Sequence, residues 1–281
     1  MSPAIEVRNL FYSYPGAEKH TLENINLVIE RGDFVVLTGP SGCGKTTLCR
    51  CLNGLIPHFY GGKFNGTVIV DGLSVKDHPI SALAQHVGFV FQNPENQLFA
   101  LSVEKDIAFG LENLALPRAE IIKRVKWAMK ITGVTELREN APHELSGGQQ
   151  QRVAIASVLA MNPHVMVLDE PTSFLDPMSS KQLFEVIQTL NKETRLTIIL
   201  VEHRLDLLSP YAKRIIVMDE GKIIADGSPR SILSSKKVFS LGVGIPKVTR
   251  LYQLLLENGV SLDSPPISVK ELERELRRRI I

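Results

Sequence analysis

The chain has few of the residues that mark secreted or membrane-spanning proteins. Of its 281 residues, three are cysteine and one is tryptophan. The cysteines (Cys43, Cys49 and Cys51) lack metal-ligand spacing, so we expect buried thiols in a reducing compartment. No apolar run approaches the roughly 18 residues that a membrane helix needs, and the N-terminus lacks signal-peptide features. We therefore expect a cytosolic protein whose contact with a membrane, if any, comes through partners.

The chain also lacks an excess of either charge. Its 32 basic residues nearly balance its 30 acidic ones, leaving a formal net charge of +2. That balance gives no nucleic-acid footprint, so we expect no nucleic-acid partner. Hydrophobic residues make up 44% of the chain, which is enough for a substantial core.

What the sequence does contain is a glycine-rich segment with the spacing G-x-x-x-x-G-K-[ST]. The apolar run 34–38 predicts a strand before it, and residues 45–53 predict a helix after it. Glycines let backbone N–H groups approach phosphate oxygens, and a helix N-terminus adds partial positive charge. Lys45 would reach the β- and γ-phosphates, and Thr46 would coordinate Mg2+. The predicted nucleotide-binding residues are Gly39, Pro40, Ser41, Gly42, Cys43, Gly44, Lys45, Thr46 and Thr47.

Two adjacent carboxylates, Asp169 and Glu170, end a second predicted buried strand. Ligands gather beyond the carboxyl ends of strands in open α/β sheets. Successive strand side chains point to opposite faces, so we expect the two residues to have different roles. Asp169 would hold Mg2+, directly or through water, and Glu170 would act as the general base on the attacking water. The alternative is a solvated acidic turn, which would leave the phosphate loop without a metal-side acid.

A third motif, Ser146–Gln149, predicts a capping box that opens a helix running to about Met161. Such a helix start presents free backbone N–H groups and the positive end of the helix dipole to an anion. The phosphate loop already holds one set of phosphates. A second anion-binding site in the same chain therefore indicates that this site contacts a second surface of the nucleotide.

Taken together, these motifs resemble the ATP-binding cassette (ABC) family over roughly residues 4–235. The resemblance implies an ATPase that pairs with a second ATPase subunit and contacts the partner's ATP through Ser146, Gly147, Gly148, Gln149 and Asp176. It also implies that Tyr14 stacks on adenine and that Gln92 senses Mg2+ and couples to a membrane partner. His203 would contact the γ-phosphate as the family's switch histidine.

Residues 93–99 and 103–113 are also similar to the ATPases of energy-coupling factor (ECF) transporters, which import vitamins or transition-metal ions in prokaryotes. This resemblance implies an energy-coupling subunit at the cytoplasmic face of the cell membrane. Its partners would be an identical or closely related ATPase, a transmembrane coupling subunit and a substrate-binding membrane subunit. The solute stays open, because specificity would lie in a membrane subunit.

Three alternatives remain at this point. The chain could serve another type of ABC importer, or be an ABC ATPase of DNA repair, chromosome organisation or translation. Proteins of the latter kind usually carry two cassettes, long coiled coils or zinc cysteines. A small-molecule phosphotransferase would leave Ser146–Gln149 unexplained.

The predicted fold is α/β, a P-loop NTPase with a RecA-like parallel core. Core strands are expected near 34–38, 87–91, 165–169, 197–201 and 214–218, beside a small antiparallel sheet from 1–32 and 64–72. A helical subdomain would occupy about 93–160 within a nucleotide-binding domain of residues 1–235. One of its helices would bury Ile121, Ile122, Val125, Ala128 and Met129, and Trp127 is also expected to be core.

Two segments are expected to contact partners. Pro94 disfavours a helix at Asn93, so residues 93–99 should form a surface loop that leaves Leu98 and Phe99 partly exposed to a membrane partner. The alternative is that both side chains pack under the helical subdomain. Residues 236–281 predict a helical extension that dimerises, with Val248, Leu251, Tyr252 and Leu255 on one helix face.

Overall fold

The fold is built around two β-sheets. The computed structural model describes residues 2–203, 205–209, 211–241, 243–244, 246–260, 262 and 264–280. The four-stranded sheet is antiparallel and has the order β2 (Leu22–Ile29), β1 (Ile5–Ser13), β4 (Lys63–Val70), β5 (Leu73–Ser74). The six-stranded sheet has the order β10 (Lys222–Gly227), β9 (Arg214–Asp219), β3 (Phe34–Thr38), β8 (Thr197–Val201), β7 (Val165–Asp169), β6 (Val87–Val90).

The five predicted core strands are confirmed, and they pair in parallel. The sequence reading missed β10, which pairs antiparallel with β9 at the edge of the sheet. Glu220 and Gly221, at the turn between them, both have positive φ, 42° and 77°. Two-residue hairpins favour that backbone conformation, so this short turn adds an edge strand to an otherwise parallel sheet.

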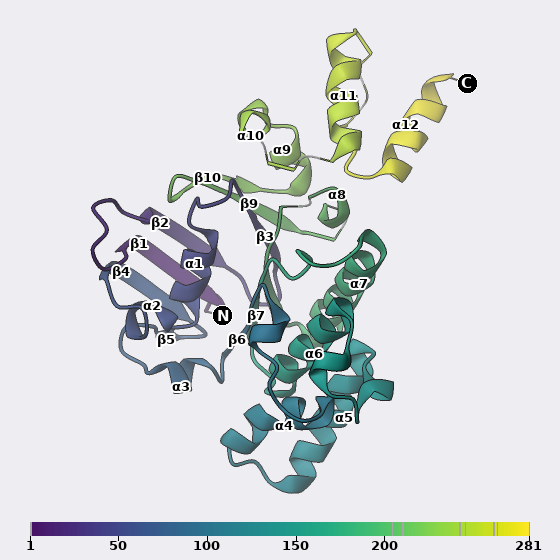
Figure 1. Ribbon diagram of the computed structural model, residues 1–281. Helices are drawn as coiled ribbons and strands as arrows, with labels where there is room; N and C mark the ends of the chain where they lie inside the picture. Colours follow the sequence, from purple (N-terminus) through teal and green to yellow (C-terminus); the bar gives the residue numbers. More distant parts are fainter. Residues whose placement is uncertain are drawn as a thin grey trace.

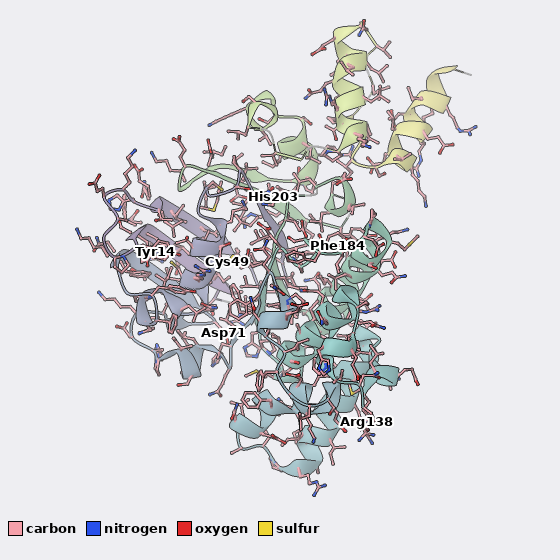
Figure 2. The ribbon with its side chains drawn as sticks, in the orientation of Figure 1. Tyr14, Cys49, Asp71, Arg138, Phe184 and His203 are labelled. Carbon is pink, nitrogen blue, oxygen red and sulfur yellow. The ribbon has the colours of Figure 1, made fainter. Side chains whose placement is uncertain are left out.

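Both faces of the six-stranded sheet are covered, which explains its continuous apolar strands. Along β3, Val35 and Leu37 pack into the core shared with the antiparallel sheet and with α1 (Lys45–Leu52). Phe34 and Val36 point to the opposite face, toward a core that includes residues of α6 (Gly147–Ala160) and α7 (Pro177–Thr194). Figure 1 shows the antiparallel sheet and α1 on one side of the six-stranded sheet and α6 and α7 on the other. Phe184 of α7 is fully buried in that second core (Figure 2).

Several helices are short, with five residues or fewer. They are α2 (Leu55–His58), α3 (Ile80–Leu83), α8 (Leu205–Leu208), α9 (Pro229–Leu233), α10 (Lys236–Ser240) and the 3-10 turns η1 (Pro94–Asn96), η2 (Thr135–Leu137) and η3 (Pro142–Glu144). None of the helices in the described part of the chain combines the length and hydropathy that a membrane span requires.

Between β6 and β7, α4 (Val103–Asn113), α5 (Arg118–Thr132) and α6 share a separate apolar core. Val125, Ala128 and Met129 are buried there as expected. Ile122 was wrongly assigned to the core and is 42% exposed, because the buried stripe of α5 runs through its neighbour Ile121. Trp127 is 37% exposed and was also wrongly assigned.

The C-terminal segment forms α11 (Lys247–Glu257) and α12 (Val269–Ile280), which pack on each other through Val248, Tyr252 and Leu272. Hydrogen bonds from Ser209 Oγ to Ile267 O (2.9 Å) and from Arg230 to Pro265 O (2.6 Å) tie this segment to the rest of the chain. The exposed side chains of α11 include Leu254, Leu256 and also Leu251, which the sequence pattern grouped with Val248 and Tyr252 on one apolar face. The pair therefore has a small core of its own and an apolar outer face.

Candidate functional site

The glycine-rich segment forms a tight loop between β3 and α1, as the motif requires. Gly39 has a φ of 150°, and a Cβ there would lie 2.1 Å from the backbone oxygen of Met218. Gly44 is the N-cap of α1, with a φ of 106° and no capping side chain. A helix start without a side-chain cap leaves its first N–H groups available to an anion. The loop is therefore shaped to bind phosphate through its backbone.

Lys45 places its ammonium group within this loop. Its side chain is buried, and Nζ donates hydrogen bonds to the backbone oxygens of Gly39 and Pro40, both at 2.9 Å. The charge is thus held among loop carbonyls that bound phosphate oxygens would replace. By contrast, Cys43 is buried in the loop, and desolvation raises the pKa of its thiol, so the thiol stays protonated.

Asp169, at the end of β7, has the properties of a metal ligand. It is 5% exposed, and its buried Oδ1 has no hydrogen-bond partner among the described residues. Burial raises the pKa of Asp169, the Glu170 carboxylate acts in the same direction, and a hydrogen bond from the Thr46 side chain opposes both. A buried, unpaired carboxylate oxygen beside a hydroxyl is a donor set that suits Mg2+. The residues present therefore fit the metal that the sequence predicted.

Glu170 is held at its position by strained backbone and by several polar side chains. Its φ is 48°, which is uncommon for a residue other than glycine. Gln92 Nε2 donates to Glu170 Oε2 at 2.9 Å, and Ser173 Oγ donates to the same oxygen at 3.2 Å. His203 Nε2 lies 2.9 Å from Glu170 Oε1. The structure thus brings together Glu170, Gln92 and His203, which are far apart in the sequence.

A buried carboxylate that the sequence reading missed supports this group. Glu202 is 3% exposed and directly follows β8, beside His203. Its Oε1 accepts hydrogen bonds from the backbone N–H (3.2 Å) and the hydroxyl of Thr172, and its Oε2 accepts from the His203 N–H at 3.1 Å. Glu202 therefore fixes the backbone at Thr172, next to Ser173, and at His203. The side chains of Ser173 and His203 are the ones that contact Glu170. The sequence did offer a signal for Glu202, namely its position directly after a buried strand and next to the predicted histidine.

Tyr14 is half-buried beside α1 and is labelled in Figure 2. Its hydroxyl lies 3.2 Å from the Thr47 hydroxyl, and its ring packs edge-on against Tyr12 with centroids 4.9 Å apart. A cavity of about 720 Å3 opens next to the phosphate loop, lined by residues 17–21 together with Glu23, Gly42, Glu220 and Gly221. The cavity places room for a nucleoside close to the loop that binds phosphate.

Ser146 and Gln149 form the predicted capping box at the start of α6. The Ser146 N–H donates to Gln149 Oε1 at 2.9 Å, and the Gln149 N–H donates to Ser146 Oγ at 3.4 Å. Ser146 and Gly147 are exposed, and Gly148 faces Leu175 and Ser179. Asp176 caps α7 by accepting from the N–H groups of Met178 and Ser179, and the Ser179 hydroxyl bond lowers the pKa of Asp176. The two helix starts thus lie against each other, at the surface.

The segment after Gln92 is an ordered turn rather than a plain loop. Asn93 is extended, as Pro94 predicted, and its side chain caps η1. Phe99 is 65% exposed and stacks edge-on with Phe109 at 4.7 Å. Leu98 packs against two of the apolar cores and is half-buried, which agrees with its predicted partial exposure. Asp106, which sequence reasoning missed, accepts the N–H groups of Phe99 and Ala100 (3.3 and 3.0 Å) and holds the segment on α4.

A phosphate loop between strand and helix, with an acid pair at the end of a parallel strand two places away in the same sheet, defines a P-loop nucleoside triphosphatase. The family model "ABC transporter" matches residues 22–173, more than half of the 281-residue chain. The chain belongs to the ABC transporter family, and it is an ATP-binding, ATP-hydrolysing member.

Known proteins of this family match over most of the chain. A putative ABC transporter ATP-binding protein of Pyrococcus horikoshii, PH1815, is 46% identical over 257 residues, covering 91% of this chain and 90% of its own length. PYRAB03730 of Pyrococcus abyssi, described in the same words, is 42% identical over 277 residues, covering 98% and 99%.

Two solved structures share the fold. CbiO1 of Clostridium perfringens, described as part of the ABC transporter complex cbiONQ, has a TM-score of 0.77 and 36% identity over 91% of this chain and 100% of its own. The cassette MJ0796, solved as a dimer in a post-hydrolysis state with ADP and Pi, has a TM-score of 0.70 and 30% identity over 80% of this chain and 99% of its own.

Proposed function

We propose that this chain is the energy-coupling ATPase of an ECF-type importer that takes up a vitamin or a transition-metal ion. The observation that carries the proposal is the hydrogen bond from Gln92 to Glu170. Gln92 directly precedes the segment in which Phe99 is exposed. The sequence resemblance of residues 93–113 and the structural likeness to CbiO1, whose description names a cbiONQ complex, support the ECF type. The chain would be peripheral, at the cytoplasmic face of the cell membrane.

Within one chain, each site residue has a role that its surroundings support. The loop backbone and Lys45 bind the phosphates, and Tyr14 and the adjacent cavity receive the adenosine. Thr46, Asp169 and Gln92 would hold Mg2+, which neutralises phosphate charge when bound. Glu170 orients and deprotonates the attacking water, while His203 contacts the γ-phosphate. Gln92, Ser173 and His203 already restrain the Glu170 carboxylate, which limits the reorganisation that catalysis needs.

The site would be completed by a second ATPase, identical or closely related. Ser146, Gly147, Gly148 and Gln149 would contact the ATP of the partner subunit, and Asp176 would lie between the two sites. Exposure of Ser146 and Gly147 at a helix N-terminus supports this role, because the positive end of the helix dipole is accessible to an anion there. The outer face of α11, where Leu251 and Leu254 are exposed, is our candidate for nucleotide-independent dimer contact.

The membrane partner would dock on the aromatic surface, which we define as Phe91, Phe99, Leu101 and Phe109. These side chains are 39%, 65%, 81% and 42% exposed. An apolar surface next to Gln92 suits the end of a helix from a transmembrane coupling subunit. A substrate-binding membrane subunit would complete the assembly.

Hydrolysis by Glu170 is tested with Glu170→Gln. Loss of a general base typically lowers turnover by about 10²–10⁴-fold. ATP binding should be retained, because the phosphate loop is unchanged, and an ATP-bound dimer should accumulate in sedimentation. Glu193→Gln, an exposed substitution on α7, is the matched control. Turnover of Glu170→Gln within about threefold of the control would refute the assignment.

Docking is tested with Phe99→Asp, measured as co-purification with the membrane subunits. The variant should keep the basal ATPase activity and thermal stability of the isolated chain, yet lose assembly, because a charge on an apolar contact surface carries a desolvation cost. The control is Ile122→Asp, which places the same charge on an exposed apolar position of α5. Normal assembly by Phe99→Asp would refute the docking surface.

A further inference from the structure

Three polar side chains converge at the amino-terminal edge of the six-stranded sheet, on the side away from the phosphate loop. Asp71 follows β4, His86 precedes β6 and His164 precedes β7. Since Asp169 ends the five-residue β7, His164 and the proposed Mg2+ ligand are separated by roughly 16 Å of strand. The cluster is therefore separate from the nucleotide site.

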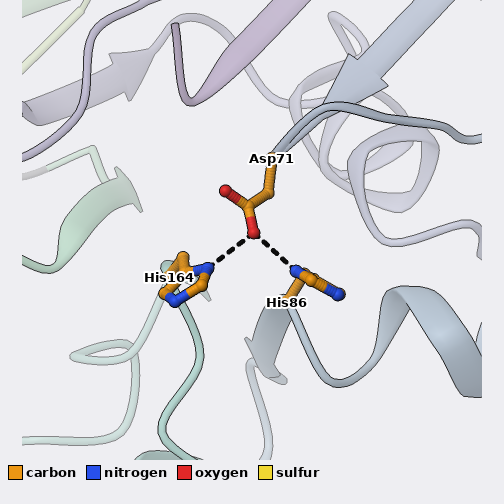
Figure 3. A group of neighbouring side chains, drawn as sticks. All are labelled: Asp71, His86 and His164. Atoms are coloured by element: carbon orange, nitrogen blue, oxygen red, sulfur yellow. Dashed lines mark hydrogen bonds and ion pairs between the residues drawn. The ribbon is translucent and has the colours of Figure 1, made fainter. Parts of the chain in front are cut away.

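The geometry of this cluster is compact and preorganised. His86 Nδ1 and His164 Nδ1 each lie 2.5 Å from the same oxygen, Asp71 Oδ2 (Figure 3). The backbones of the two histidines are also joined, since the N–H of His164 donates to His86 O at 3.0 Å. The backbone of Asp71 is fixed separately, by its N–H donating to Ala4 O at 2.7 Å. Ligand atoms carried by bonded strand ends are positioned before any ligand arrives.

The donor set is that of a transition-metal site. Two imidazole nitrogens and a carboxylate oxygen, all within 4.8 Å of one another, offer the ligands that Zn2+, Co2+ and Ni2+ prefer. Around a tetrahedral ion with bonds of about 2.0–2.1 Å, ligand atoms lie about 3.3 Å apart. Seating an ion thus requires each Nδ1 to move away from Asp71 Oδ2 by less than about 1 Å.

The surroundings orient the carboxylate and leave the site accessible. In the metal-free cluster burial raises the pKa of Asp71, but hydrogen bonds from His164, His86 and Arg31 outweigh it and lower the pKa to about 2. A bound ion would replace the two imidazole bonds, whereas Arg31, which binds the other oxygen, Oδ1, at 2.6 Å, would still orient the carboxylate. His164 is 58% exposed and lines a cavity of about 430 Å3 with Arg31, Trp127 and Arg195, which gives an ion a path to the cluster.

We propose that Asp71, His86 and His164 bind one divalent first-row transition-metal ion of the Zn2+ class and thereby tie the antiparallel sheet to the parallel one. Each neutral imidazole would carry its proton on Nε2 and ligate through Nδ1. Mg2+ and Ca2+ are not expected here, because they favour oxygen ligands and the nearby Arg31 charge opposes an ion that gains little from imidazole. The fourth position would be open to water on the exposed side.

The test uses the full, tag-free chain, stripped with chelator and kept free of nucleotide, so that the phosphate site contributes no metal. Equilibrium dialysis with Co2+ should show one tightly bound ion per chain, and added Zn2+ should raise the melting temperature. His86→Ala and His164→Ala should weaken Co2+ binding by at least about tenfold and remove the thermal shift.

Two further variants separate metal binding from a hydrogen-bonded cluster without metal. His164→Gln keeps a side-chain donor for Asp71 but removes the imidazole, so it should fold and bind ATP normally while losing Co2+ affinity to the same extent. His78→Ala removes a half-buried histidine that bonds to the Ser74 backbone oxygen outside the cluster, and it should bind Co2+ like wild type. The proposal is overturned if the wild-type chain binds no Co2+, or if His164→Gln binds it as tightly as wild type.

Discussion

Replacing Glu202 with glutamine tests whether a buried carboxylate positions the hydrolysis site. The wild-type carboxylate accepts the N–H and hydroxyl of Thr172 on Oε1 and the N–H of His203 on Oε2. The glutamine oxygen can keep the Thr172 pair, but its amide nitrogen then faces the His203 N–H, donor against donor. One hydrogen bond to a charged acceptor is lost inside the protein.

The lost hydrogen bond to His203 sets the minimum size of the effect. A hydrogen bond to a charged group contributes about 1.5–3 kcal/mol, so Glu202→Gln should lower the free energy of unfolding by at least that amount. Turnover should also fall, because His203 and the 172–173 segment support the Glu170 carboxylate. The Kd for ATP should change little, since the phosphate loop is not touched.

Urea unfolding of the nucleotide-free chain and steady-state ATPase assays with Mg-ATP measure these quantities. Thr172→Val is the informative second variant, because it removes the hydroxyl bond and keeps both backbone bonds. It should therefore show a smaller loss of turnover than Glu202→Gln. Surface substitutions usually stay within about 0.5 kcal/mol. A change no larger than that in Glu202→Gln, with normal turnover, would refute the positioning role.

Three further predictions follow from other parts of the molecule. Lys45→Ala should raise the Kd for ATP by about 10- to 100-fold, because charge-assisted bonds to the phosphates are lost. The control Lys181→Ala, at an exposed position, should leave the Kd unchanged. Equal Kd values for the two variants in equilibrium dialysis would contradict the prediction. In chelator-treated protein, Asp71→Asn should cost about 2 kcal/mol at pH 7. That difference, measured by urea unfolding, should persist above pH 4 and vanish as the pH falls through the folded pKa of about 2. A chain ending at residue 246 should bind ATP normally but sediment as a weaker dimer without nucleotide; unchanged association would show that α11 and α12 serve their own chain alone.

Much of the fold was predictable because local patterns and the tertiary structure agree. The strand over 34–38 is apolar on both faces, and the structure buries all five residues against two cores. The capping box at Ser146 needs only residues 146–149, so its geometry is local and was predicted correctly. The same holds for Asn93, whose extended backbone follows from Pro94.

What the sequence could not predict depends on contacts between distant segments. Asp71, His86 and His164 share no local motif, and they meet because β6 and β7 are neighbours in the sheet and β4 ends nearby. Trp127 lies on an otherwise typical helix, and its exposure depends on the cavity that it lines with Arg31 and His164. Periodicity assigns a face to a residue, whereas topology decides what covers that face.

Gln92 joins the proposed hydrolysis site to the proposed docking surface through a segment that is held in place by side-chain bonds. Its amide contacts Glu170, and the residues after it are held by side-chain bonds. The Glu95 N–H donates to Asn93 Oδ1 at 3.0 Å, and Gln97 bonds to the backbone of both Phe89 and Phe91. Asp106 fastens the far end to α4. A flexible loop would absorb a displacement of Gln92 locally. Because this segment is stiffened at both ends, a change at the Glu170 carboxylate should be carried to Phe99 and α4, which is the physical requirement for coupling hydrolysis to a membrane partner.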